Sequence, residues 1–404
     1  MPPDVRALSE DEFEEFAAVL SQAFGFAPRE DEKERWKRDV ELDRSLGAFE
    51  EGRLVGTAAA ITFDLTVPGG TIATAGVTMV AVLPTHRRQG VLREIMRRQL
   101  GDVIDREEPT ASLWASESVI YSRFGYGMAA TNVVWELEPS HFRIAHSTAP
   151  KGRVRLIEVE KARKVLPPLY DELRESRPGF LTWSENRWEW TWSDPEHRRE
   201  GGSPKRFVVY EDGGHVRGAA AYRTKPGWTD GHPTGSVDVR LLLAATLDAY
   251  EGLWAHCLGI DLVSGVTAHF RPVDEPLIWM LADPRRLRRR HADGLWIRIT
   301  DVPKALVGRT YGTEGRLVLD VRDGFLGQGG RFALEGGPEG AECTPSVEQP
   351  DLTLDVQALG AIYLGADHVR GLAQAARISG DPAAIRLADS MFRGEREPWC
   401  PTLF

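Results

Sequence analysis

The first 140 residues combine two kinds of hydrophobic pattern. From Ser9 to Phe24, apolar residues recur at intervals of three and four, the spacing of an amphipathic helix, and a second predicted helix covers about 30–40. Short runs of β-branched and small apolar residues predict strands between and after the helices, at 45–49, 54–66, 71–83, 112–116 and 130–137. A basic helix reaching about Val103 and a helical turn at 119–126 separate the last three, so the pattern indicates a mixed α/β region ending near Pro139.

The pattern at 52–59, Gly-Arg-Leu-Val-Gly-Thr-Ala-Ala, is echoed at 214–221 as Gly-His-Val-Arg-Gly-Ala-Ala-Ala. Each copy is followed by a β-branched strand, at 77–82 and at 236–243. The echo therefore predicts a second region with the same fold. The second copy runs from its strand into a helix without an arginine-rich glycine turn, so we expect it to lack a cofactor site.

From about Leu295 the pattern changes to alternating strands at 315–321, 330–334 and 351–356, joined by glycine-rich turns and followed by two predicted amphipathic helices. The last helix begins at Asp381-Pro382, a capping residue followed by proline at the first helical position. The chain closes on an apolar, proline-stiffened tail at 398–404, for which packing of a hydrophobic terminus is an equal alternative to a functional role. The predicted domains are 1–140, 150–292 and 293–404.

Composition supports this division. A chain of 404 residues exceeds the size of a single core, and 42% apolar with 27% charged residues is typical of a soluble globular protein. The three cysteines (Cys257, Cys343 and Cys400) lack the paired spacing of a disulfide framework or metal site, so we expect a cytoplasmic location and no metal. A leader-like start and an apolar stretch of about 20 residues are both missing, which predicts no membrane insertion.

The net charge of −10 opposes nucleic-acid binding and mildly favours cationic substrates. The basic run Arg285–Arg290 could suggest nucleic acid, but we interpret it as a solvated helix face.

The segment from Val77 to Arg93 carries the candidate chemistry. A strand leads to the turn Arg87-Arg88-Gln89-Gly90, which opens the basic helix. The free amides and positive dipole end of such a helix suit a pyrophosphate, and Gly90 permits close approach of the backbone. The preceding strand could hold a pantetheine arm, with Val80 or Val82 offering an N–H to the thioester carbonyl. The alternative is an ordinary basic helix start after a strand.

The hexapeptide Arg87-Arg88-Gln89-Gly90-Val91-Leu92 is similar to the cofactor motif Gln/Arg-x-x-Gly-x-Gly/Ala of the GCN5-related N-acetyltransferases (GNAT), and departs from it at Leu92. The longer string from Val80 to Arg93 is followed by Ala115-Ser116-Glu117 and by Ile120-Tyr121-Ser122-Arg123-Phe124-Gly125-Tyr126-Gly127. Together these segments resemble the Eis (enhanced intracellular survival) acetyltransferases, and the resemblance covers essentially the whole chain.

The resemblance implies an α/β (α+β) fold with two GNAT-type mixed-sheet domains, the second degenerate, and a C-terminal sterol-carrier-protein-like domain. It also implies a homohexamer that uses acetyl-CoA as cosubstrate to acetylate amines, including aminoglycosides and protein lysines. The cofactor contacts it implies are Val80, Ala81, Val82, Arg88, Gln89, Gly90, Val91, Leu92, Arg93, Ser116 and Glu117.

Two catalytic groups follow from the same resemblance. Tyr121 matches the family's proton donor, and the C-terminal carboxylate of Phe404 matches its proton acceptor. An exposed α-carboxyl titrates near about 3.5 and is a poor base, so burial would have to raise its pKa. Glu117 is the alternative base, and Tyr126 is expected to pack.

Substrate walls are expected from the large side chains of Phe24, Phe26, Trp36, Met79 and Trp192, for each of which core packing is the open alternative. The predicted function is transfer of an acetyl group, through a tetrahedral intermediate, to a primary amine of a cationic acceptor. The alternative is a non-catalytic CoA- or lipid-binding protein.

Overall fold

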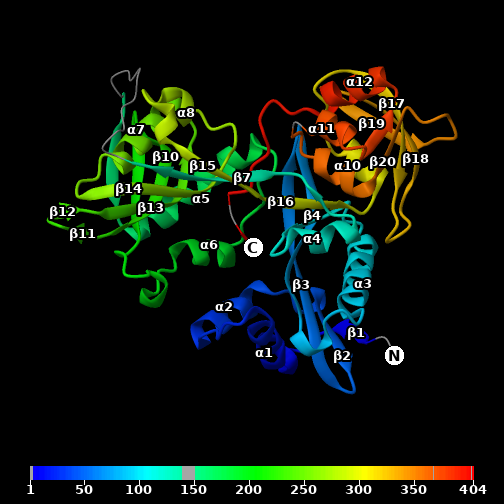
Figure 1. Ribbon diagram of the computed structural model, residues 1–404, viewed down its shortest axis with the longest axis horizontal. Helices are drawn as coiled ribbons and strands as arrows, with labels where there is room; N and C mark the ends of the chain where they lie inside the picture. The colour runs from blue at the N-terminus through cyan, green and yellow to red at the C-terminus, as the bar shows by residue number, and fades with distance from the viewer. Residues whose placement is uncertain (1–2, 139–150, 367, 402) are drawn as a thin grey trace.

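A computed structural model describes residues 3–138, 151–366, 368–401 and 403–404, so the expected boundary at 140–150 lies outside the described residues. Figure 1 shows three lobes: the first sheet at the lower centre, the second at the left and the third at the upper right. Two seven-stranded sheets and one five-stranded sheet agree with the predicted fold of two similar mixed-sheet domains and a C-terminal α/β domain. Among the described residues, no helix combines the length and apolar composition needed to cross a bilayer.

The first sheet has the order β1-β2-β3-β4-β5-β16-β6. Its strands are β1 (Asp4–Ala7), β2 (Ser45–Glu50), β3 (Arg53–Val67), β4 (Gly70–Val82), β5 (Thr110–Trp114), β6 (Gly127–Met128) and β16 (Leu295–Ile299). The helices of this region are α1 (Phe13–Phe24), α2 (Glu30–Asp39), α3 (Val91–Asp105) and α4 (Ser118–Tyr121). The apolar stripe of α1, including Phe16 and Leu20, is buried against Leu54 of β3, as its periodicity predicted.

The second sheet has the order β15-β7-β14-β13-β10-β9-β8. Its strands are β7 (Thr131–Leu137), β8 (Arg153–Ile157), β9 (Arg206–Asp212), β10 (His215–Lys225), β13 (Gly235–Ala244), β14 (Val263–Arg271) and β15 (Arg288–Asp293), with a small ribbon of β11 (Trp228–Thr229) and β12 (His232–Pro233). The helices are α5 (Val159–Glu175), α6 (Glu185–Trp192), α7 (Leu247–Leu258) and α8 (Leu277–Met280). The hairpin β10–β13, then α7 and the parallel strand β14, repeats β3–β4, α3 and β5, which confirms the echoed second domain.

Two strands cross the expected domain limits. Strand β7, expected to close the first region, instead pairs with β14 and β15 of the second sheet. Strand β16, from the start of the third region, pairs with both β5 and β6 of the first sheet. The sequence alone does not predict these pairings, because the hydrophobic pattern of a strand does not determine which strand it pairs with.

The basic run Arg285–Arg290 is not the helix face that its sequence suggested. It forms a short 3-10 turn (Pro284–Arg286) and the start of β15, whose side chains are mostly exposed at the edge of the second sheet. Strand β7 provides the hydrogen-bond partners for the backbone of β15. Charged side chains suit an edge strand because they discourage its free edge from pairing with a strand of another molecule.

The third region has a five-stranded sheet with the order β19-β18-β17-β20-β21. Its strands are β17 (Gly315–Arg322), β18 (Gly330–Gly337), β19 (Gly340–Pro345), β20 (Leu352–Asp355) and β21 (Ile378–Gly380), and its helices are α9 (Val302–Val307), α10 (Val356–Ile362), α11 (Val369–Gln374) and α12 (Pro382–Phe392). Two helices were predicted after β20, whereas the described residues form three. Gly365 lies between the first two of these helices, and its φ of +91° belongs to the left-handed region, which does not continue a right-handed helix.

Candidate active site

Strands β4 and β5 run parallel and then separate. Thr74–Val77 pair with Thr110–Leu113, and β5 ends one residue later at Trp114. Strand β4 continues to Val82, and no described residue of β5 pairs with its last five positions. One edge of β4 therefore faces an opening rather than a neighbouring strand.

A β-bulge turns this part of β4. Thr57 of β3 pairs with Ala81, but Ala59 pairs with Thr78, so one residue of β3 faces two of β4. Met79 has a φ of +52°, and its carbonyl accepts a hydrogen bond from Thr57 Oγ1 at 2.9 Å. A bulge adds local twist and re-aims the following backbone groups, so it helps to turn the edge at Val80 away from the line of β5.

The opening of α3 lies directly after this edge. Gly90 is the N-cap with a φ of +93°, and its carbonyl accepts from the amides of Arg93 and Glu94 at 2.9 and 3.2 Å. Among the described residues, no side chain caps this helix end. The amides of Val91 and Leu92 therefore remain at the positive end of a 15-residue helix, which favours an anion.

These elements enclose a cavity of about 790 Å³. Every predicted cofactor residue except Gln89 lines it, together with Phe24 and Tyr121. The Gln89 amide instead donates to Thr85 O at 2.9 Å, which stabilises the turn. Arg87 also lines the cavity, and its guanidinium donates to Ala23 O at 3.0 Å, which joins the turn to α1.

The third region closes one side of the cavity, which the sequence did not reveal. Gly324 and Phe325, in the turn after β17, line it. The Phe325 ring packs edge-on against Phe124 at 5.0 Å, and the Arg93 guanidinium lies 6.0 Å from its centre. Asp323 fixes the turn by accepting from Phe325 N at 3.1 Å.

Asp323 is itself held by a buried ion pair with Arg298 of β16, 2.7 Å away. Asp-Gly after a strand is a turn signal in the sequence, but nothing in the pattern places that turn beside α3. The insertion of β16 into the first sheet carries Arg298, and with it Asp323 and its turn, to this place.

Tyr121 ends α4 on the cavity wall and is 5% exposed. Burial, and to a smaller extent the charge of Glu117, raises its pKa to about 12. Its ring packs edge-on against Tyr126 at 5.9 Å. Tyr126 is fully buried, its pKa is raised well above the usual range by burial, and it lies outside the cavity lining, in agreement with a packing role. Glu117 is exposed at the cavity rim.

Phe404 reaches the first sheet from the other end of the chain. Its ring packs edge-on against Phe63 of β3 at 5.2 Å, and a Cβ built at Gly76 of β4 would lie 3.2 Å from it. Successive residues of a strand face opposite sides of the sheet, and Val77 packs in one cluster with Tyr121. Tyr121 and Phe404 therefore approach β4 from opposite faces, at the point where β4 and β5 separate, although Phe404 lies outside the cavity lining.

The predicted substrate walls fall into two places. Phe24, Phe26 and Trp36 form a chain of ring contacts at 6.4 and 5.7 Å beside the cavity, with Phe24 50% and Phe26 41% exposed. Met79 packs with Trp36 at the edge of the α1 core. Trp192 lies in the second-domain core, stacked on Trp188 at 5.2 Å, because the apolar face of α6 is buried there.

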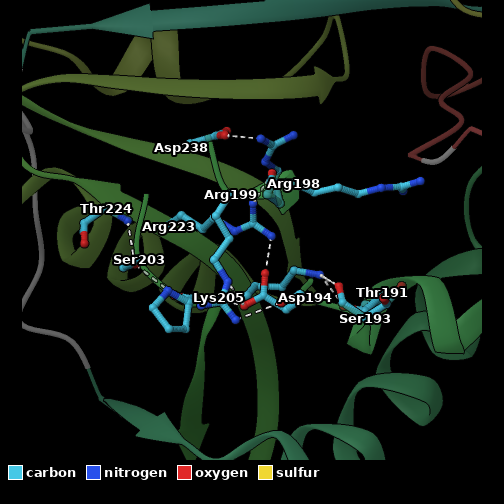
Figure 2. A network of polar contacts seen from close by, with 12 residues as sticks. Thr191, Ser193, Asp194, Arg198, Arg199, Ser203, Lys205, Arg223, Thr224 and Asp238 are labelled. Carbon is cyan, nitrogen blue, oxygen red and sulfur yellow. Dashed lines mark hydrogen bonds and ion pairs between the residues drawn. The ribbon is translucent and has the colours of Figure 1, made fainter. Parts of the chain in front are cut away.

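The end of α6 also ties the second domain to α2. Figure 2 shows Asp194 between two arginines, with ion pairs to Arg199 at 3.3 Å and to Arg223. The neighbouring Ser193 hydroxyl accepts from Arg35 of α2. Trp190 of α6 donates its indole N–H to Asp39 at the end of α2. The Asp194 ion pairs hold this end of α6 within the second domain, and the contacts of Ser193 and Trp190 join it to α2, which carries Trp36.

Comparisons with known proteins agree with this architecture. Residues 4–129 and 179–299 each match an acetyltransferase (GNAT) domain, and residues 302–401 match a sterol carrier protein domain. An N-acetyltransferase of Streptomyces avermitilis is 38% identical over 99% of both chains, and the N-acetyltransferase Eis of Mycobacterium tuberculosis is 35% identical over 89% of both. The crystal structure of Eis1 from Mycobacterium abscessus superposes with a TM-score of 0.86 at 32% identity, covering 99% of this chain and 100% of that one.

Proposed function

Since the chain belongs to the Eis-like N-acetyltransferases and is an acyltransferase of the GNAT type, we propose that it transfers the acetyl group of acetyl-CoA to a primary amine of a cationic acceptor. The observation that carries the proposal is the junction of β4 and β5. There an open strand edge, an uncapped helix start and Tyr121 surround one cavity, and Phe404 lies behind the same strand.

The cavity fits the chemistry of a CoA thioester. The opening of α3, with Arg88 and Arg93 exposed beside it, would hold the pyrophosphate by amides and charge. The free edge of β4 would hold the amides of the pantetheine arm as an added strand does. The amide of Val80 or Val82 would then polarise the thioester carbonyl and stabilise the oxyanion of the tetrahedral intermediate.

Proton movements in the transfer are assigned to two groups. The neutral amine attacks the carbonyl carbon, and the amine loses its proton to the Phe404 carboxylate. When the carbon–sulfur bond breaks, Tyr121 donates its phenolic proton to the departing sulfur. Because the pKa of Tyr121 is about 12 and that of a thiol about 8.5, donation must accompany bond breaking rather than precede it.

Support for the acceptor class comes from charge and from the family. The net charge of −10 attracts cations, and the half-exposed rings of Phe24 and Phe26 offer faces on which a cationic amine can bind. Aminoglycosides, protein lysines and a homohexamer come from the family resemblance, and a cytoplasmic location comes from the unpaired spacing of the three cysteines. We propose them on that basis, and sedimentation of the purified chain tests the hexamer.

The test is thiol release from acetyl-CoA with a panel of aminoglycosides and lysine peptides. We expect turnover by the natural chain and a loss of about 100-fold or more when two glycines are added after Phe404, because the extension displaces the carboxylate. The control is the same extension at the N-terminus, which should leave the rate unchanged. Equal turnover with the C-terminal extension would exclude Phe404 as the base.

A lipid-binding role is the second candidate, favoured by an apolar cavity of about 350 Å³ between β16 and the helices α10 and α11. Trp296, Ala361 and Leu372 are among its lining residues. Recovery of a bound lipid together with no turnover on any amine of the panel would favour this role over acetyl transfer.

A further inference from the structure

The second domain contains a counterpart of the β4–β5 opening. Strands β13 and β14 pair in parallel over Gly235–Val239, after which β13 continues to Ala244 and leads into α7. A cavity of about 260 Å³ lies at this point. Its lining includes Leu242 near the end of β13 and Thr246 at the start of α7, the counterparts of the β4 and α3 positions that line the first cavity.

Groups of the chain itself occupy this second opening. Arg271, at the end of β14, donates to Leu242 O at 2.9 Å and to Glu275 Oε2 at 2.9 Å. Both charged side chains are almost fully buried, at 3% and 4% exposed. Thr246 accepts from Ala249 N at 3.2 Å and so caps α7. One carbonyl at the end of β13 and one amide at the start of α7 are thus bonded within the chain, whereas no side chain among the described residues caps the start of α3.

Trp399 of the C-terminal tail also enters this cavity. Its backbone N–H donates to Pro178 O at 2.8 Å, and its indole N–H donates to Phe270 O at 2.6 Å. Its ring packs edge-on against Phe180 at 5.2 Å. The guanidinium of Arg271 lies 5.2 Å from the ring centre, within the range of a cation–π contact.

Arg177 clamps the chain just before this tryptophan. Its guanidinium donates to Glu397 O at 3.1 and 2.9 Å and forms an ion pair with Asp274, which in turn accepts from Glu397 N at 3.2 Å. Gly179, with a φ of +97°, allows the tail to lie close, because a Cβ there would be 2.9 Å from Trp399 backbone atoms. A buried ring, an arginine clamp and backbone hydrogen bonds thus hold one short stretch of tail.

We propose that the second domain's former cofactor opening is the anchor of the C-terminal tail, and that Trp399 and Arg177 are positioning residues that deliver the Phe404 carboxylate to β4. Figure 1 shows the tail leaving the third region, crossing to the second sheet and ending between the first two domains. Five residues beyond the anchor span at most roughly 17 Å. Anchoring therefore confines the terminus to a small volume and removes most of the orientational search that a free tail would make. This inference rests on the proposed role of Phe404.

The experiment measures tail release and catalysis in Trp399→Ala, with Trp399→Phe as the conservative variant and exposed Trp279→Ala as the matched control. Carboxypeptidase A, which removes apolar C-terminal residues, reports release of Phe404 without reference to activity. We expect release about tenfold faster and kcat about tenfold lower in Trp399→Ala, with the KM for acetyl-CoA within about twofold of the natural chain. Trp399→Phe should keep the release rate and kcat close to those of the natural chain, and Trp279→Ala should change neither the release rate nor kcat.

Arg177→Gln provides a second route if Trp399→Ala does not fold, and it should show the same two changes. Release at the natural rate in a folded variant would overturn the anchor. Faster release of Phe404 with unchanged kcat would overturn the positioning role of Trp399 and Arg177. If the glycine extension after Phe404 leaves turnover intact, the base assignment fails, but release still shows whether the anchor exists.

Discussion

The two acetyltransferase domains place the same elements around their strand openings and treat them in opposite ways. In the first, α3 begins at Val91 after the N-cap Gly90, and among the described residues no side chain caps it. In the second, α7 is capped by Thr246, and Arg271 occupies the strand edge. The comparison teaches that a cofactor can bind at such an opening only where backbone groups of the strand and helix lack partners within the protein. A few internal hydrogen bonds to those groups turn the same opening into a part of the protein core.

The sharpest test of this difference compares one tyrosine from each cavity, Tyr121 and Tyr250. We expect Tyr121→Phe to lower kcat by about 100-fold or more, because the variant loses the proton for the departing sulfur. Tyr250→Phe should leave kcat within about twofold. Steady-state kinetics on acetyl-CoA and an amine acceptor decide the matter, and equal losses in both variants would mean that the domains are not functionally distinct.

The ion pair that fills the second opening should matter for stability. We expect Arg271→Met to lower the free energy of unfolding by about 3–5 kcal/mol, because Glu275 is then left buried without its partner. Urea denaturation of the full chain measures this, and the double variant Arg271→Met with Glu275→Leu should recover most of the loss. A loss below about 1 kcal/mol would show that water enters the cavity and replaces the pair.

Two glycines, the N-cap Gly90 of α3 and Gly101 in its interior, allow a smaller test. A Cβ at Gly90 or at Gly101 would have none of the described atoms within 4 Å, but only Gly90 has a positive φ. Gly90→Ala should cost about 1–2 kcal/mol of stability and raise the KM for acetyl-CoA a few-fold, whereas Gly101→Ala should stabilise the helix by up to about 1 kcal/mol. Thermal melting and initial rates measure both variants, and similar effects would refute a special backbone role for Gly90.

The smallest expected effect concerns the pH profile, in which we expect no fall of kcat near the usual pKa of tyrosine. The pKa of Tyr121 is raised to about 12, so its proton stays bound well above the usual tyrosine range. We therefore expect kcat to remain level from pH 8 to about 10, because the acid form is lost only as the pH approaches 12. A decline centred near pH 10 would show that Tyr121 titrates as an ordinary solvent-exposed phenol.

The local features of the site could be predicted from the sequence because the residues that form them are consecutive in the chain. The turn at Arg88–Gly90, its strand and its helix are neighbours in the chain, and their order is itself the signal. The fold class also followed from periodicity, the echo and the family resemblance. Phe325 could not be found, because its approach to α3 depends on β16 entering a sheet whose other strands lie far earlier in the chain. Trp192 lies in a core, the alternative that the sequence left open for it, since an aromatic helix face has the same pattern whether it lines a cavity or a core.

The position of β16 has a consequence for how this protein is made. Roughly 180 residues separate the end of β5 from the strand that lies beside it. At common synthesis rates of about 5–20 residues per second, the ribosome needs about 10–35 s to produce that stretch. During this time the nascent first sheet presents β5 as an unpaired edge, the state in which newly made chains aggregate or recruit chaperones. Fragments that stop before Leu295 should therefore be poor expression products, even though they contain the whole cofactor turn.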